Sequence, residues 1–201
     1  VERCVFGGYY QSGQSCISVQ RIYVHRDIYD AFRDTFVDAV RKIKVGDPRD
    51  EATFVGPIIS EDDAERIEQT IRNAVKQGGR LLCGGSRKGR LVEPVVLENV
   101  PRTADASCRE IFGPVTLLDS FSNFDDALAE VNDSDYGLQA GVFTRDIGHV
   151  QKAWDELQVG GVLINEIPSW RADHMPYGGS KDSGLGREGL RWAIESMTEP
   201  R

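Results

Sequence analysis

The chain has 201 residues and a formal net charge of −8, from 24 basic and 32 acidic side chains; 40% of its residues are apolar and 8% are aromatic. This length and composition are typical of a globular chain that buries its own core, and they argue against disorder. Arg and Lys are scattered among acidic residues, and no apolar run approaches the ~20 residues of a membrane-spanning helix, so neither nucleic acid nor membrane is an expected partner.

The first half of the chain predicts two amphipathic helices among short strands. A strand is expected over residues 20–25, followed by a helix over 27–43 in which apolar side chains recur every three or four positions. A second helix is expected over 60–77, because Ser60 and Asp63 have the spacing of an N-terminal capping box. Further strands are expected over 80–83, 93–97 and 115–121.

Helices and strands are also expected to alternate in the second half of the chain. Its expected elements are a helix over 124–131, a strand over 141–144, a helix over 147–157, a strand over 161–165 and a helix over 187–197. Such alternation predicts an α/β fold with a mostly parallel sheet flanked by helices. Sheets of this kind bind ligands outside the carboxyl ends of their strands, so we expect the long loop over 166–184 to carry chemistry.

Cysteine is the residue type that points most directly to chemistry. Three of the four cysteines are expected to pack as small apolar groups, namely Cys4, Cys83 and Cys108. Cys16 differs, because it ends the segment FGGYYQSGQSC between a helical stretch and the strand expected near Gln20. Gly13 lets the backbone turn sharply, and the small Ser15 leaves room for a ligand. A thiol at such a junction is placed to react.

The cysteine pattern also bears on the compartment. No C-x-x-C pair is present, and Glu2 and Arg3 interrupt the apolar start that a signal peptide needs, so a reduced, cytoplasmic setting is expected. Because the chain starts at Val1 and not at Met, we expect a processed chain or a fragment.

Two further patterns predict no cofactor or metal site. The histidines lack ligand spacing, so no metal site is expected. Gly184, Gly186 and Gly189 fit G-x-G-x-x-G, but a Pro/Gly-rich loop precedes them where a dinucleotide fingerprint needs a strand. This segment therefore predicts a glycine-rich turn that enters a helix.

Four motifs, spread over nearly the whole chain, resemble the aldehyde dehydrogenase superfamily. They are Gly13-Gln-Ser-Cys16 followed by Arg21; Glu110-Ile-Phe-Gly-Pro114; Asn132 with Tyr136-Gly-Leu138 before Gly141-Val-Phe-Thr144; and Pro176-Tyr-Gly-Gly179-x-Lys181 with Ser183-Gly-x-Gly-Arg-Glu188. Residues 170–176 are similar to the branch that handles small polar or anionic aldehydes, such as lactaldehyde or phosphonoacetaldehyde.

This resemblance implies an enzyme that oxidises an aldehyde to a carboxylic acid with NAD or NADP. Cys16 would form a thiohemiacetal, a hydride would pass to the cofactor, and water would release the acid from a thioester. Glu110 would hydrogen-bond the nicotinamide ribose, and Phe112 would steady the nicotinamide. Without the other motifs, Glu110 would read as a solvated turn carboxylate and Phe112 as a core aromatic.

The resemblance also implies how the substrate is held. Trp170, Tyr177 and Tyr10 would form aromatic walls around the acyl group, although aromatic side chains are also common core fillers. Arg171 would pair with a substrate carboxylate or phosphonate, since a guanidinium binds such groups with two parallel hydrogen bonds. The alternative for Arg171 is a surface salt bridge.

Parts of the family's machinery have no counterpart in this sequence. Residues 1–184 would form the catalytic domain, with a nucleophile loop near 13–17 and a substrate loop over 166–184, and residues 185–201 a C-terminal helix directed toward an absent N-terminal dinucleotide-binding domain. The general-base glutamate of an E-L-G-G-K type motif and the asparagine of the oxyanion hole are also absent. The chain by itself is therefore expected to be inactive, and the full-length protein to be a homodimer or homotetramer.

Two other classes of function stay open on the residues alone. One is a cysteine-dependent hydrolase or acyl-transfer enzyme, which would need His25 or His174 as a base close to Cys16. The other is a non-catalytic module retained for assembly with a partner.

Overall fold

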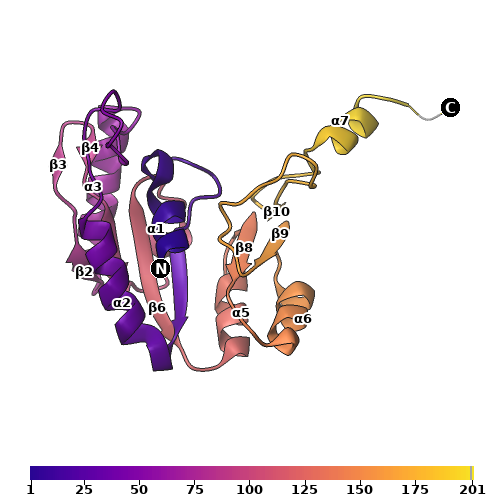
Figure 1. The fold of residues 1–201 in the computed structure, drawn as a ribbon, viewed down its shortest axis with the longest axis horizontal. Helices are drawn as coiled ribbons and strands as arrows, with labels where there is room; N and C mark the ends of the chain where they lie inside the picture. The colour runs from indigo at the N-terminus through magenta and orange to yellow at the C-terminus, as the bar shows by residue number, and fades with distance from the viewer. Residues whose placement is uncertain (200) are drawn as a thin grey trace. The chain divides into compact units, whose positions relative to one another are not determined.

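The computed structural model describes residues 1–199 and 201, and it divides into two compact units, Val1–Asn123 and Phe124–Arg201 (Figure 1). Each unit buries its own apolar cluster, so each is described by itself. The expected catalytic domain over 1–184 spans the first unit and most of the second.

The first unit is built on a four-stranded sheet in the order β1-β6-β5-β2. Its strands are β1 (Arg21–His25), β6 (Val115–Phe121), β5 (Val95–Glu98) and β2 (Arg80–Cys83). The first three are parallel, whereas β2 is antiparallel to β5, so the expectation of a mostly parallel sheet needs correction to a mixed one. The reason is the connection from β2 to β5. It is a small hairpin of β3 (Arg87–Lys88) and β4 (Leu91–Val92), without the helical crossover that parallel neighbours need.

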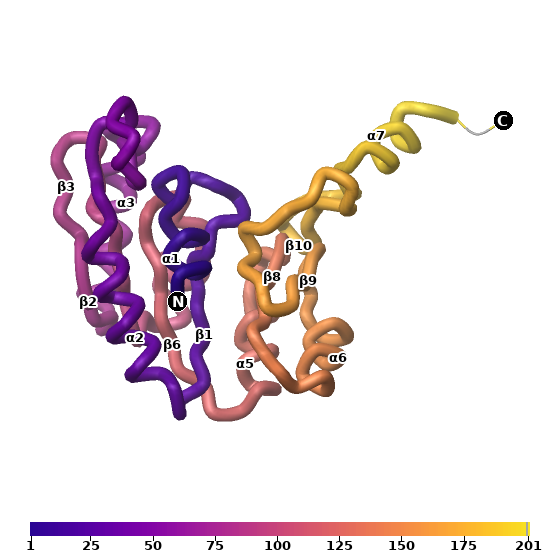
Figure 2. Tube along the Cα trace, in the orientation of Figure 1, coloured from indigo at the N-terminus to yellow at the C-terminus, as the bar shows by residue number. Residues whose placement is uncertain are grey.

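Helices cover this sheet. They are α1 (Glu2–Tyr9), the 3₁₀ turn η1 (Tyr10–Gly13), α2 (Arg26–Arg41), α3 (Glu61–Lys76) and α4 (Asp105–Cys108). The trace in Figure 2 shows β1 beside β6, and α1 packs against β6. The helices predicted over 27–43 and 60–77 are confirmed with small shifts at their ends, as α2 and α3. The hairpin and α4 span only two to four residues per element, too short for periodicity to predict.

The predicted cap of α3 is confirmed. The Ser60 hydroxyl accepts a hydrogen bond from the Asp63 backbone N–H at 3.0 Å and donates to the Asp63 carboxylate at 2.6 Å. The apolar stripe that follows is buried in the core of the unit, through Ala64, Ile67, Ile71 and Ala74. Local sequence therefore fixes both where this helix begins and which face it buries.

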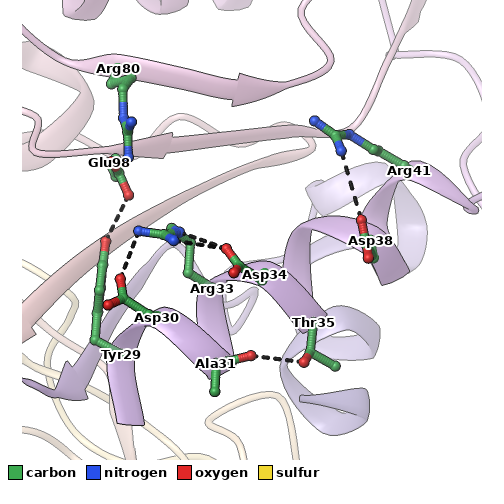
Figure 3. Close-up of polar contacts among 10 residues, drawn as sticks. All are labelled: Tyr29, Asp30, Ala31, Arg33, Asp34, Thr35, Asp38, Arg41, Arg80 and Glu98. Carbon is green, nitrogen blue, oxygen red and sulfur yellow. Dashed lines mark hydrogen bonds and ion pairs between the residues drawn. The ribbon is translucent and has the colours of Figure 1, made fainter. Parts of the chain in front are cut away.

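A buried carboxylate joins α2 to the sheet (Figure 3). Glu98, at the end of β5, is only 2% exposed, and it forms an ion pair with Arg80 on β2. The Tyr29 hydroxyl on α2 donates to its Oε2 at 3.0 Å, and partial burial and the nearby Asp119 carboxylate raise the pKa of Tyr29. An unpaired buried carboxylate is costly, so these partners are what allow Glu98 to lie inside. The other ion pairs drawn on α2 join Arg33 to Asp30 and Asp34, and Arg41 to Asp38.

The second unit has two small sheets. Its elements are α5 (Phe124–Asn132), β7 (Tyr136–Gly137), β8 (Gln139–Val142), α6 (Ile147–Glu156), β9 (Gly161–Ile164), β10 (Ser180–Lys181) and α7 (Leu190–Ser196). Strands β8 and β9 are parallel, whereas β7 and β10 are antiparallel. Leu128, Ala153 and Leu157 form the buried cluster of this unit. Over the described part of the chain, no helix combines the length and apolar character that crossing a membrane would require.

Candidate functional site

Cys16 lies at the tip of a tight turn between η1 and β1. The Ser18 backbone N–H donates to the Ser15 carbonyl at 2.9 Å, which closes the turn around Cys16, and the Cys16 side chain is exposed. Cys4 is buried, as expected for a packing residue. The same expectation is wrong for Cys108, which is exposed at the end of the one-turn helix α4 and donates from its thiol to the Ala104 carbonyl at 3.2 Å.

The backbone before Cys16 is held in an unusual conformation. Gln11, Ser12 and Gly13 have φ values of 50°, 60° and 69°, in the left-handed region that non-glycine residues rarely adopt. Side chains anchor this run. The Ser12 hydroxyl donates to the Gly56 carbonyl and accepts from the Gly56 N–H, both at 3.0 Å, and the Gln14 side-chain Oε1 accepts from the Ile59 N–H at 2.9 Å. Such conformations persist only where the surroundings enforce them. The turn that presents Cys16 is therefore rigidly supported.

Gly13 brings the Cys16 turn against a second loop. A Cβ atom on Gly13 would lie 2.1 Å from the Gly113 carbonyl oxygen, far inside van der Waals contact. The predicted need for glycine at this position is thus confirmed for two reasons, the positive φ and the close approach of two backbones. The loop on the other side carries Glu110 and Phe112, so the two motifs meet although they lie about one hundred positions apart in the sequence.

Glu110 and Phe112 are both presented at the surface of the first unit. Glu110 is exposed, yet the protein around it removes part of its hydration and raises the pKa of its carboxyl, an effect that the nearby Arg66 guanidinium opposes. Phe112 is 40% exposed and has a φ of 53°. The alternative that Phe112 is a core aromatic is therefore wrong. The residue in the core is its neighbour Ile111, 2% exposed.

Both loops lie at the amino ends of parallel strands. The Cys16 turn precedes β1 and the Glu110 loop precedes β6, and these strands pair from Arg21 with Leu117 onward. The candidate residues of the first unit therefore lie at the amino ends of their strands, whereas the loop over 166–184, where chemistry was expected, follows the carboxyl end of β9.

His25, one of the two bases considered for a hydrolase, lies away from the Cys16 turn. It lies at the carboxyl end of β1, about 13 Å from Arg21 at ~3.3 Å of rise per residue. Its Nδ1 accepts a hydrogen bond from the Asp27 N–H at 3.3 Å and caps α2, and its ring packs edge-on against Phe121. Strand β1 therefore separates His25 from the Cys16 turn.

Tyr10 lies close to the Cys16 turn in the first unit. Its ring stacks parallel to Phe6, with centroids 5.3 Å apart, and its hydroxyl is hydrogen-bonded to the Ser15 hydroxyl. Ser15 precedes Cys16, so Tyr10 contacts the turn directly and is half-buried beside it. Its role as a substrate wall stays a prediction.

The remaining predicted site residues gather in the second unit. The Arg171 guanidinium lies over the Tyr177 ring, 4.3 Å from its centroid, and approaches the Glu188 carboxylate at 4.0 Å. Tyr177 is buried and forms a backbone bridge with Glu188, whereas Trp170 is 45% exposed. The surface salt bridge considered for Arg171 is therefore present, and Tyr177 offers its ring face to Arg171.

Sequence reasoning missed two side chains that hold the Glu110 loop. The Gln20 carboxamide bonds the backbone of this loop at three points, and an Arg66 Nη donates to the Ile111 carbonyl at 3.0 Å. No local pattern marks either residue, because both act across more than forty positions of sequence. Among the described residues, no group of three or more His, Cys, Asp or Glu side chains is arranged to hold a metal ion.

The candidate site of the first unit is thus an exposed thiol on a turn with left-handed backbone, packed against a loop with an exposed carboxylate and aromatic ring. The sequence model of the Aldehyde dehydrogenase family matches residues 1–201. The chain belongs to this family.

Individual proteins that are similar to this chain are dehydrogenases as well. The chain is 46% identical over 190 residues to a 3-sulfolactaldehyde dehydrogenase from Priestia aryabhattai, covering 94% of this chain and 40% of the relative. It is similar to aldehyde dehydrogenase 21 from Physcomitrella patens, solved with the reaction product succinate (TM-score 0.97, 49% identity, 98% of this chain and 41% of that one). It is also similar to a glyceraldehyde-3-phosphate dehydrogenase from Methanocaldococcus jannaschii, solved with NADP (TM-score 0.94, 40% identity, 98% of this chain and 42% of that one). The chain thus spans about two fifths of the length of these relatives.

Proposed function

We propose that this chain supplies the nucleophile and part of the cofactor contacts of an NAD- or NADP-dependent aldehyde dehydrogenase whose substrate is a small aldehyde with an acidic group. The observation that carries the proposal is the exposed Cys16 on a turn packed, through Gly13, against the loop of Glu110 and Phe112. Family membership over the whole chain supports the same reaction.

In the proposed reaction, the Cys16 thiolate attacks the aldehyde carbon and forms a carbon–sulfur bond, and the carbonyl oxygen takes up the negative charge. NAD or NADP, when bound, would supply the hydride acceptor that this oxidation needs, and Cys16 would then carry a thioester. Attack of water on the thioester carbon, with one water proton passing to the general base, then breaks the carbon–sulfur bond, releases the carboxylic acid and regenerates the thiolate. Cys16 therefore makes and loses one covalent bond in each cycle.

Glu110 and Phe112 fit one end of the cofactor. An exposed carboxylate accepts hydrogen bonds from ribose hydroxyls, and an exposed ring two residues further on offers a flat apolar face to the nicotinamide. We further propose that residues 1–184 act as the catalytic domain, and that the dinucleotide platform, the general base and the oxyanion-hole asparagine come from sequence beyond these 201 residues. The 201-residue chain alone should then show no dehydrogenase turnover.

Arg171 supports an acidic substrate. Stacking on Tyr177 fixes the plane of its guanidinium, while its pair with Glu188 is long at 4.0 Å and lies between exposed side chains, which makes it weak. A substrate anion could therefore replace Glu188 as the partner of Arg171. The three relatives described above point the same way, because 3-sulfolactaldehyde, succinate and glyceraldehyde-3-phosphate each carry an acidic group.

Replacing Arg171 should change substrate preference. In the longest natural chain that contains this segment, Arg171→Met should raise KM for succinic semialdehyde about 10- to 100-fold, the loss of one charge-assisted contact. KM for butyraldehyde, which has the same four carbons without the carboxylate, should change less than about threefold. The measurement is the rate of NAD(P)H formation with each aldehyde.

Two controls accompany the Arg171 experiment. Arg49→Met removes another exposed, paired arginine, whose partner is Asp47, and should leave both KM values unchanged. The isolated 201-residue chain should give no rate with either aldehyde. An equal rise in KM for both aldehydes would contradict a role of Arg171 in anion recognition. A full rate from the isolated chain would contradict the proposal that the general base and the dinucleotide platform come from other residues.

Cofactor affinity should depend on the ionisation of Glu110. Partial loss of hydration beside the surrounding protein raises the pKa of this carboxyl above the ~4.3 of an ordinary glutamate. The charged form is the better acceptor for ribose hydroxyls, so KM for the cofactor should rise as pH falls through this raised pKa, and this rise should begin at a higher pH than an ordinary glutamate would give. Glu110→Gln should raise KM about 3- to 10-fold at neutral pH and flatten its dependence on acid pH.

The pH experiment is read from cofactor KM at several pH values. Glu51→Gln is the control, because Glu51 is also an exposed carboxylate of the first unit but lies in another loop. It should keep the wild-type profile. A profile in Glu110→Gln that matches the wild type would rule out the assigned role of Glu110.

A further inference from the structure

One side chain near Cys16 holds the backbone on both sides of Glu110. The Gln20 Nε2 donates to the Arg109 carbonyl at 2.8 Å and to the Ala106 carbonyl at 3.0 Å. Its Oε1 accepts from the Ile111 N–H at 3.0 Å. The carbonyl of Arg109 and the N–H of Ile111 belong to the two peptide groups that adjoin Glu110. A single carboxamide therefore fixes both of them.

Gln20 is itself held from the sheet. Its backbone carbonyl accepts from the Leu117 N–H at 2.7 Å, where β1 begins to pair with β6. It lies four residues after Cys16, so the same short segment carries the thiol and the anchor of the Glu110 loop. The Arg66 bond to the Ile111 carbonyl completes the hold on this loop, and Phe112 follows with its left-handed backbone.

The chemistry of these bonds requires a carboxamide of this length. Two of the three contacts need a donor and the third needs an acceptor, a combination that a neutral carboxamide supplies and a carboxylate does not. A carboxylate at this position would keep the bond from Ile111 but would face two carbonyl oxygens with negative charge. An asparagine would be one methylene shorter and could not span the same distance from β1.

We propose that Gln20 is a positioning residue: its carboxamide fixes the orientation of Glu110, and hence cofactor affinity, relative to the turn of Cys16. The inference rests on the proposed function, because it takes the role of Glu110 from it. Gln20 is an addition to the proposed site, and it does not touch the reacting atoms. Gln20 acts through the two peptide groups on either side of Glu110, and what it controls is the orientation of that carboxylate.

Removing the carboxamide should weaken cofactor binding selectively. In the longest natural chain containing this segment, Gln20→Met, which has nearly the same side-chain length, should raise the Kd for NAD(P) about tenfold or more. The rate of Cys16 alkylation by iodoacetamide should stay within about twofold, since the turn around Cys16 is anchored separately by Ser12 and Gln14. Gln20→Glu should weaken cofactor binding further. Gln69→Met, which removes an exposed carboxamide that donates to Asn73 on α3, should change neither quantity.

A second measurement does not depend on the variants folding. In the wild-type protein, the Ile111 amide should exchange with deuterium at least about a hundredfold more slowly than an unstructured amide, because Gln20 accepts its hydrogen bond. Fast exchange at Ile111 would overturn the proposal, as would unchanged cofactor Kd in Gln20→Met, or alkylation slowed in step with cofactor binding. If instead the wild-type protein binds no nicotinamide cofactor while Ile111 is protected, the proposed function fails and not the observed anchoring of the loop.

Discussion

Cys16→Ser should abolish aldehyde oxidation, lowering kcat by at least about a thousandfold, the scale found when an enzyme loses its nucleophile. A serine hydroxyl has nearly the same size and fits the same exposed turn, so the variant should fold and bind cofactor as the wild type does. The loss would then arise from chemistry, because an alcohol is ionised far less readily than a thiol and forms no thioester. NAD(P)H formation and cofactor Kd, measured on the longest natural chain containing this segment, give the two readouts.

Cys108→Ser is the matched control for this experiment. Cys108 is the other exposed cysteine of the first unit, and a serine can keep its bond to the Ala104 carbonyl. It should retain wild-type kcat. In the Cys108→Ser background, iodoacetamide should label Cys16 and stop turnover, since Cys4 is buried and Cys83 partly buried.

The same two variants separate the competing functions. A cysteine-dependent hydrolase would lose p-nitrophenyl acetate turnover in Cys16→Ser and would need no nicotinamide cofactor for it. A non-catalytic module would show no rate to lose and no change on labelling. Aldehyde oxidation at the wild-type rate in Cys16→Ser would contradict the proposed mechanism.

Gly13→Ala should cost about 3–5 kcal/mol of unfolding free energy, the range of severe backbone conflicts. Part of this is the ~1–2 kcal/mol penalty of an alanine in the left-handed region. The larger part is the clash of its Cβ with the Gly113 carbonyl, 2.1 Å away, since this contact is between backbones and no side chain can swing aside. The clash also pushes the Cys16 turn from the Glu110 loop, so kcat should fall about 100-fold even where the protein folds.

Gly89→Ala isolates the cost of the left-handed backbone, because it adds no clash. Gly89 has a φ of 58°, close to the 69° of Gly13, but its nearest neighbour to a new Cβ is a Glu61 carboxylate oxygen at 4.0 Å. It should cost about 1–2 kcal/mol and leave kcat unchanged. Urea unfolding and steady-state rates measure both variants. Equal costs for the two would mean that the approach of Gly13 to Gly113 does not hold the loops together.

Local patterns in the sequence were sufficient for several elements. The cap at Ser60 and the apolar stripe after it predicted α3, and β6 was expected over the residues it occupies, because burial period and capping are properties of neighbouring residues. The sharp turn at Gly13 could also be predicted from the sequence, because the freedom to adopt a positive φ is a local property of glycine. The family was recognisable from the spacing of four motifs, and the comparison with its sequence model bears it out.

Other features arose only where distant segments meet. The antiparallel edge strand β2 depends on how the chain returns to β5, and the three bonds of Gln20 reach residues 86 to 91 positions away. Arg171 was expected to bind an anion or form a salt bridge, but its stacking on Tyr177 needed the fold of the second unit.

The sequence by itself therefore determined which residue types can do chemistry here and which elements carry them, because propensity, capping and motif spacing act over a few positions. Only the tertiary structure decided that the Cys16 turn and the Glu110 loop meet at the amino ends of β1 and β6, and that Gln20 joins them. The physical reason is that hydrogen bonds and backbone contacts between segments depend on strand pairing, and no single stretch of the chain encodes that pairing.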